Sequence, residues 1–132
     1  MNAFLIDLEN KVGELARITE AIAAKGVNIT SVSGSTCGDG GSVAIMTADE
    51  AATRAALQDA RCSFREIEAT ETTIRNVPGA LAKACRRLAE GGLNIDALMP
   101  TGMQGEDVMV AFVTNDPAKA RNILSHTGSA SS

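Results

Sequence analysis

The residues best suited to hold a small polar ligand form a set that occurs twice in the chain. An asparagine amide offers both a donor and an acceptor, so it could bind the ammonium and carboxylate ends of a zwitterion together. The first turn of a helix supplies free N–H groups and a partial positive charge, and a glycine there lets a carboxylate approach the backbone. The residues of these types are Asn10, Gly13 and Asn28, followed by Asn76, Gly79 and Asn94.

Each of these residues also has a purely structural explanation. Asn10 and Asn76 could simply cap the helices that follow them. The glycines at the two turns could simply permit tight packing of a helix against a sheet. The later asparagines follow Gly26 and Gly92, which we expect to end helices in a left-handed conformation, so they could be turn residues. The residue types alone leave both explanations open.

The spacing of the two sets indicates an internal duplication. Six residue identities share one register, with no gap, at an offset of 66 positions. We therefore expect one repeat over residues 1–68, a second over residues 69–124, and a flexible Ser/Gly-rich tail over residues 125–132. The identities join Asn10 to Asn76, Gly13 to Gly79, Leu15 to Leu81, Gly26 to Gly92, Asn28 to Asn94 and Ile29 to Ile95.

The first repeat predicts the element order β-α-β-β-α-β. Residues 3–9 alternate between apolar and polar side chains, which is typical of a half-buried strand. Asn10 precedes a helix whose apolar face we expect to contain Leu15, Ile18 and Ile22. Strands are also expected over residues 28–35, 42–47 and 62–68, with a hairpin loop over residues 37–41 and a helix over residues 49–60.

The second repeat follows the same order but stops early. No strand pattern follows its last helix, so the fourth strand is either missing or shared, with residues 64–74 serving both repeats as one long strand. We favour the shared strand, because no linker-like residues separate the copies. An unpaired sheet edge would tend to recruit another chain, so we expect a homodimer. The expected elements are strands over residues 70–74, 94–102 and 107–114, a helix with Leu81, Ala84 and Leu88 on its apolar face, and a helix over residues 117–124.

The duplicated unit resembles the ACT domain. Its element order, with helices on one face of an antiparallel sheet, is the ferredoxin-like α+β layout. The pattern Asn-x-x-Gly-x-Leu at the first turn and Gly-(Val/Leu)-Asn-Ile at entry to the second strand is similar to the motifs of that family. Residues 76–81, Asn-Val-Pro-Gly-Ala-Leu, look like its commonest form. Over about residues 3–124 the chain resembles the free-standing tandem ACT proteins.

The resemblance implies a small regulatory module that senses free amino acids. In this family two modules typically pair edge to edge through their second strands, and the amino acid binds at that junction. Side-chain specificity would then come from second-strand residues such as Ser31, Ser33, Leu98 and Met99. The ligand-binding positions implied by the resemblance are Asn10, Lys11, Val12, Gly13, Asn28 and Ile29 in the first copy, and Asn76, Val77, Pro78, Gly79, Asn94 and Ile95 in the second.

Composition and charge argue against other classes of partner. Twelve basic and sixteen acidic residues give a net charge of −4, whereas nucleic-acid binding needs a basic face. No signal pattern and no run of about 18 apolar residues occurs, so we expect a soluble cytoplasmic protein without membrane contact. Cys37, Cys62 and Cys85 lack the paired spacing of a disulfide framework or a zinc site. We therefore expect no metal and no cofactor.

Catalysis is not expected either. His126 is the only histidine and falls in the expected tail, so no serine or cysteine nucleophile has a histidine partner. Residues 38–41 lack the lysine and the following helix of a phosphate loop. Three functions remain: an amino-acid-binding regulatory protein, a ligand-free protein-interaction or transcription-modulating scaffold that acts through a partner protein, and a metal- or redox-responsive variant that uses the cysteines.

Overall fold

The computed structural model describes residues 1–130, with side chains described through Ser125. The chain divides between Ile67 and Glu68 into two compact units. The first unit contains β1 (Asn2–Glu9), α1 (Glu14–Ala23), β2 (Ile29–Cys37), β3 (Gly40–Thr47), α2 (Glu50–Asp59) and β4 (Phe64–Glu68). The second contains β5 (Thr70–Arg75), α3 (Ala80–Glu90), β6 (Ile95–Gln104), β7 (Asp107–Thr114) and α4 (Pro117–Ala130).

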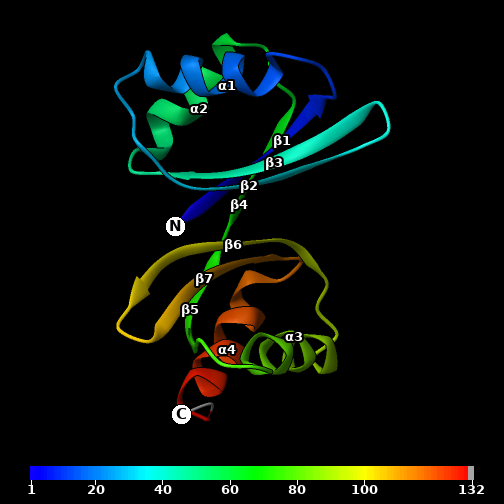
Figure 1. Cartoon of the computed structure of the whole chain (residues 1–132), viewed down its shortest axis with the longest axis vertical. Helices are drawn as coiled ribbons and strands as arrows, with labels where there is room; N and C mark the ends of the chain where they lie inside the picture. The colour runs from blue at the N-terminus through cyan, green and yellow to red at the C-terminus, as the bar shows by residue number, and fades with distance from the viewer. Residues whose placement is uncertain (131–132) are drawn as a thin grey trace. The chain divides into compact units, whose positions relative to one another are not determined.

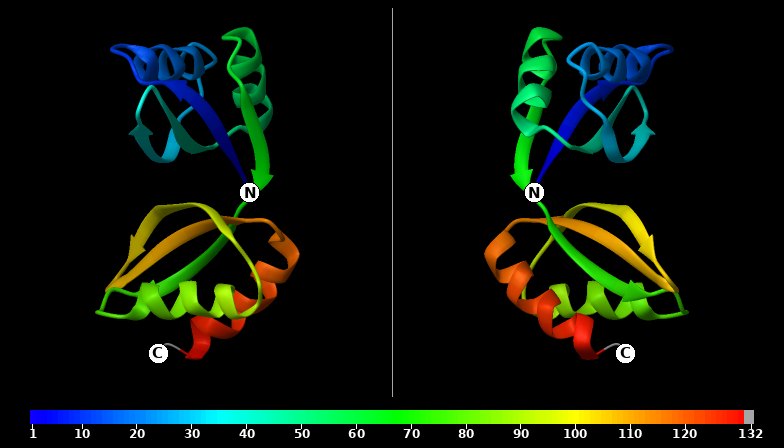
Figure 2. Two further views of the ribbon diagram at one scale, coloured as in Figure 1. Left: turned by 90° about the vertical axis from the view of Figure 1, so that its right-hand side faces the viewer. Right: turned by 90° about the vertical axis from the view of Figure 1, so that its left-hand side faces the viewer.

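The first unit is a four-stranded sheet with two helices on one face (Figures 1 and 2). Its strands lie in the order β2-β3-β1-β4, so β2 forms one edge. β3 runs antiparallel to both β1 and β2, which places Ile45 opposite Phe4 and Val43 opposite Gly34. This is the expected ferredoxin-like α+β repeat. Its core between sheet and helices consists of Phe4, Ile6, Ile18, Ile22, Val43, Ile45, Ala56 and Leu57.

The second unit repeats this arrangement with one strand fewer. Its sheet has the order β5-β7-β6, and α3 and α4 cover one face (Figure 2). Among the described residues this sheet has no fourth strand, which confirms one of the two expected arrangements. The favoured alternative, a single strand over residues 64–74, is wrong. β4 and β5 are separate strands with Ala69 between them, and β4 pairs within the first sheet.

The last helix runs further than its sequence suggests. α4 begins at Pro117, as expected, but continues to Ala130 instead of ending at Leu124. Most of the segment expected as a flexible tail is therefore helical, while Ser131 and Ser132 lie outside the described residues. The segment contains no proline after Pro117, and extending a formed helix costs little per residue compared with starting one.

The buried faces of α1 and α3 differ from the expected ones by one position. Ile18 and Ile22 are buried as predicted, but the third buried residue of α1 is Glu14, and Leu15 is 46% exposed. In α3 the buried residues are Ala80, Ala84 and Leu88, whereas Leu81 is 41% exposed. Because leucine is apolar, its side chain favours a core position. The buried residues instead recur every four positions, at 14, 18 and 22 in α1 and at 80, 84 and 88 in α3, which leaves both leucines outside the buried face. Leu15 and Leu81 thus occupy equivalent exposed positions.

Glycines past the ends of α1 and α3 adopt the left-handed conformation that the sequence predicts for them. Gly26 has a φ of 74° and Gly92 a φ of 78°, and a Cβ at either position would meet no atom within 4 Å. A side chain there would therefore strain the backbone without a steric clash.

We predict that Gly26→Ala and Gly92→Ala each lower the free energy of unfolding by about 1 kcal/mol, because alanine disfavours a positive φ. Chemical denaturation measures the effect. Gly102→Ala is the control, since Gly102 has no positive φ and its Cβ would meet only Met109 Sδ, at 3.8 Å. A loss at Gly102 equal to that at the other two positions would contradict the assignment of strain to the left-handed conformation.

Candidate functional site

The turn between β1 and α1 is built from a left-handed glycine and an asparagine that binds a neighbouring loop. Gly13 immediately precedes α1, with a φ of 87°, and its carbonyl accepts the N–H of Arg17 at 2.9 Å. The Asn10 amide Nδ2 donates to Gly38 O at 2.9 Å, and the Asn10 N–H donates to Asp39 O at 2.8 Å. These bonds fix the turn to the tip of the β2–β3 hairpin.

Helix capping, the structural explanation left open for Asn10 and Asn76, does not apply to either residue. The residue before the first helical position is Gly13 in one copy and Gly79 in the other, and neither helix has a side-chain cap. Asn10 lies four residues before Glu14, too far to act as the N-cap. The Asn76 N–H donates to Glu106 O at 3.1 Å, so it binds its own hairpin in the equivalent way.

No side chain caps α1. Its first amide, that of Glu14, donates to Lys11 O at 3.4 Å, but neighbouring amides lack acceptors. Within the described part of the chain, the N–H groups of Val12, Gly13 and Leu15 have no hydrogen-bond acceptor. Val12 is fully exposed, and a Cβ built on Gly13 would meet nothing within 4 Å. Free amides at a helix N-terminus carry a partial positive charge, so this open turn can accept an anionic group.

Four charged side chains surround the turn and pair with one another. Lys11 Nζ lies 3.0 Å from Glu9 Oε2 and 3.8 Å from Glu14 Oε2, and Arg17 Nη2 binds Glu14 Oε1. The bond from Arg17 lowers the pKa of the Glu14 carboxyl, and the bond to Glu9 raises the pKa of the Lys11 ammonium. Both groups therefore stay ionised near neutral pH, and the two positive charges balance the two negative ones.

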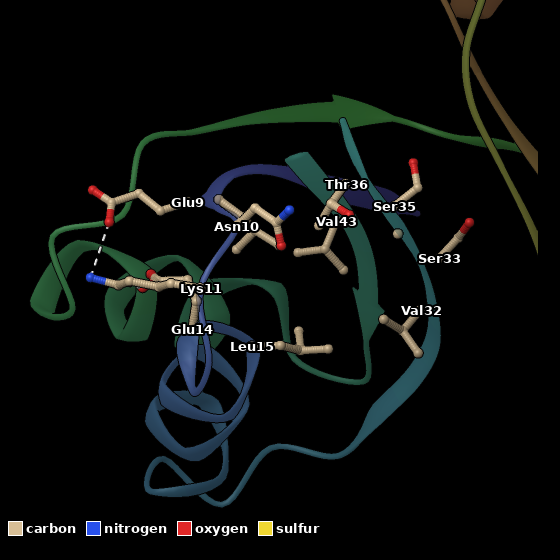
Figure 3. Close-up of a pocket in the computed structure, with 12 residues that line it drawn as sticks. Glu9, Asn10, Lys11, Glu14, Leu15, Val32, Ser33, Ser35, Thr36 and Val43 are labelled. Atoms are coloured by element: carbon tan, nitrogen blue, oxygen red, sulfur yellow. Dashed lines mark ion pairs between the residues drawn. The ribbon is translucent and has the colours of Figure 1, made fainter. Parts of the chain in front are cut away.

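A pocket of about 400 Å³ lies between this turn, the start of α1 and the edge strand β2. Leu15 and Val32 point toward one another across it, from α1 and β2 (Figure 3). Gly34 and Val43, which are paired across β2 and β3, line the pocket floor below these two side chains. As a glycine, residue 34 places no side chain in the pocket. The pocket thus combines an apolar floor with a charged rim. Its lining residues are Leu8, Glu9, Asn10, Lys11, Glu14, Leu15, Val32, Ser33, Gly34, Ser35, Thr36 and Val43.

The structure brings only some of the expected first-copy residues to this pocket. Asn10 and Lys11 line it, and Val12 and Gly13 follow them in the same turn. Asn28 and Ile29 lie at the other end of β2, outside the lining. The Asn28 side chain is exposed, and its carbonyl accepts the N–H of Ala48 at 3.3 Å. Of the expected specificity residues, Ser33 lines the pocket and Ser31 does not.

In the second copy the expected residues lie in equivalent places with different neighbours. All four turn residues, Asn76 to Gly79, are exposed. The Asn94 N–H donates to Asn115 Oδ1 at 3.0 Å, and its amide Nδ2 donates to Asp96 Oδ1 at 2.8 Å. Asn94 therefore joins the start of β6 to the segment between β7 and α4, and its side chain binds the residue two positions along its own chain. Ile95 is the first residue of β6.

Sequence reasoning missed several residues that line the pocket. Leu15 is expected in the core, yet the structure places it at the pocket and buries Glu14 instead. Val32, which is 50% exposed, lies on an edge strand where a large apolar side chain has no partner on one side. The available signal was the leucine shared by both copies immediately after the first helical residue, at Leu15 and Leu81.

The metal- or redox-responsive alternative depends on clusters of metal-binding side chains and on the cysteines. The residues that the structure describes hold no group of three or more His, Cys, Asp or Glu side chains that could bind a metal ion. The three cysteines are free, with Cys37 exposed and the other two half-buried. The side chain of His126 lies outside the described part. No described helix has the length and apolar character needed to cross a bilayer.

Comparison with known proteins gives a family match for part of the sequence and several matches to solved structures. Residues 3–62 match the sequence model of the ACT domain. The chain is similar to protein BT0572 from Bacteroides thetaiotaomicron, with 25% identity and a TM-score of 0.78 over 95% of this chain and 86% of that one. Curated proteins provide no sequence match.

Two further solved structures share the fold at lower identity. The regulatory subunit of aspartate kinase from Thermus flavus is 16% identical, with a TM-score of 0.67 over 98% of this chain and 90% of its own. The ligand-free form of the same subunit from Thermus thermophilus is also 16% identical, with a TM-score of 0.64 over 96% and 91%. The sequence match covers most of the first unit, and the second unit repeats its order of strands and helices with one strand fewer.

Proposed function

We propose that this protein is a regulatory protein that binds a free amino acid where ACT domains meet. The observation that carries the proposal is the first-copy pocket, which places free helix amides and paired charges beside an apolar floor. The α-carboxylate would bind the N–H groups of Val12 and Gly13, which have no acceptor in the described structure. The α-ammonium would bind a rim carboxylate, from Glu9 or Glu14.

The comparisons with solved structures support a regulatory role for this protein. Two of the solved structures that share this fold are named as regulatory subunits of an enzyme, and one of them as a ligand-free form. We extend the same role to this chain, with ligand contacts at the positions implied by the family resemblance. These are Asn10, Lys11, Val12, Gly13, Asn28 and Ile29, and in the second copy Asn76, Val77, Pro78, Gly79, Asn94 and Ile95.

A second copy of the chain would complete the site. β2 forms one edge of the first sheet, and it contributes Val32 to Thr36 to the pocket. Pairing of this edge with another ACT domain would cover the pocket and bury the exposed Val32 side chain. Ligand binding at such a junction stabilises one dimer arrangement, and a partner protein would respond to that arrangement.

A thermal-shift screen of the twenty amino acids tests ligand binding. At a concentration 100 times its Kd, a ligand adds about 2.7 kcal/mol to the free energy of unfolding, so at least one amino acid should raise the melting temperature clearly. If none does so at millimolar concentration, the protein is instead a ligand-free scaffold that acts through a partner protein.

The two turn glycines provide a matched pair of variants. Gly13 and Gly79 both have a φ of 87°, and a Cβ added at either would meet open space, so alanine should destabilise both copies to a similar extent. We expect Gly13→Ala to weaken binding at the first-copy pocket at least about tenfold, because the methyl group blocks the approach of the carboxylate to the backbone. Calorimetric titration with an amino acid found in the screen measures this. An affinity of Gly13→Ala equal to that of the unaltered chain would contradict the placement of the carboxylate.

Light scattering tests the assembly. We predict a mass near twice 13.6 kDa at micromolar concentration, because the unpaired edges favour association with a second copy. Val32→Lys, which places a charge on the exposed edge strand, should shift the population toward the monomer. Leu81→Lys places the same charge at an exposed leucine of α3 and tests whether any added lysine has this effect. A monomeric mass for the unaltered chain would contradict a ligand site at a junction between two copies.

A further inference from the structure

The apolar side chains of the first-copy pocket face solvent from two different elements. Leu15 on α1 is 46% exposed and Val32 on β2 is 50% exposed, and the two point toward one another (Figure 3). Leu8 and Val43 lie in the same pocket, from β1 and β3. Exposed apolar surface of this kind is covered favourably by an apolar group, at a gain proportional to the area removed from water.

The charged groups of the rim leave no unbalanced charge for a ligand side chain. Lys11 bridges Glu9 and Glu14, and Arg17 binds Glu14 from the other side. Two positive and two negative charges therefore neutralise one another around the turn. These four groups therefore offer the side chain of a ligand no unpaired opposite charge, whereas Leu15 and Val32 offer it apolar contact area.

The volume of the pocket limits the size of the ligand. Gly34 lies opposite Val43, and a Cβ built on it would lie 3.2 Å from Val43 Cβ and 3.0 Å from Ser42 O. β2 therefore packs closely on β3 at this point, with no room for a side chain on residue 34. The volume of about 400 Å³ is near the lower end for small-molecule sites, and it must also hold the backbone atoms of the amino acid.

We infer that the first-copy pocket selects amino acids with short aliphatic side chains, such as valine, leucine and isoleucine. This inference rests on the proposed amino-acid binding. The side chain of the ligand lies between Leu15 and Val32, over Gly34 and Val43. Ser33 and Ser35 alternate with Val32 and Gly34 along β2, and their hydroxyl groups point away from Leu15 (Figure 3). The second copy has Val77, Ala80 and Pro100 where the first has Lys11, Glu14 and Gly34, so it does not reproduce this site.

The experiment compares ligands first and variants second. Titration calorimetry of the full chain with L-valine, L-leucine, L-isoleucine, L-phenylalanine, L-aspartate and L-lysine should give the lowest Kd for one of the three aliphatic amino acids. Tighter binding of aspartate, lysine or phenylalanine would overturn the inference and leave amino-acid binding intact. If none of the six binds but another amino acid does, the inference again fails alone. Absence of binding by all twenty would overturn the proposed function itself.

Leu15→Ala and Leu81→Ala are the matched variants, since the two leucines occupy equivalent and similarly exposed positions on α1 and α3. We expect Leu15→Ala to raise the Kd for the preferred aliphatic amino acid about tenfold, through loss of apolar contact area, and Leu81→Ala to leave it within about twofold. Val32→Ser, on a different element, should act like Leu15→Ala. An unchanged Kd in both Leu15→Ala and Val32→Ser, or an equal loss in Leu81→Ala, would overturn the assignment of specificity to this pocket.

Discussion

The first-copy pocket depends on the two hydrogen bonds that join Asn10 to the tip of the β2–β3 hairpin. They hold the β1–α1 turn beside the edge strand, at distances of 2.9 and 2.8 Å to Gly38 O and Asp39 O. Without them the turn would be attached only through β1 and α1, and its distance from β2 would not be fixed. The left-handed Gly13 then starts the helix without a side-chain cap, so the amides of Val12, Gly13 and Leu15 meet no capping oxygen in the described part of the chain.

The duplication preserves the geometry of the turn but not its chemistry. Gly13 and Gly79 have the same φ, and Asn10 and Asn76 both donate their N–H groups to the following hairpin. The charges of the rim differ between the copies, because Arg75, Val77, Ala80 and Lys83 stand where the first copy has Glu9, Lys11, Glu14 and Arg17. At these four positions the second copy keeps two basic residues and has neither acidic residue. The same left-handed glycine therefore starts a helix beside paired charges in the first copy and beside basic residues in the second.

The sequence predicted the elements well, because periodicity and glycine positions report directly on local structure. The order of strands and helices, the left-handed Gly26 and Gly92, and the missing fourth strand of the second sheet were all among the expectations. The errors concern choices that depend on tertiary structure. An asparagine before a helix can cap it or bind a distant hairpin, and only the fold brings Gly38 within reach of Asn10. An apolar residue at the flank of a helix can face the core or a pocket, and Leu15 faces the pocket.

Chemical-shift mapping reports which backbone amides meet the ligand. A nitrogen–proton correlation spectrum of the full chain would be recorded during titration with the amino acid that binds best. Placement of the ligand between the β1–α1 turn and β2 predicts that the largest changes fall on Val12, Gly13 and Leu15 and on residues 32–36, with smaller changes at Gly79 and Leu81. Changes confined to other parts of the chain, with these amides unmoved at saturation, would contradict it.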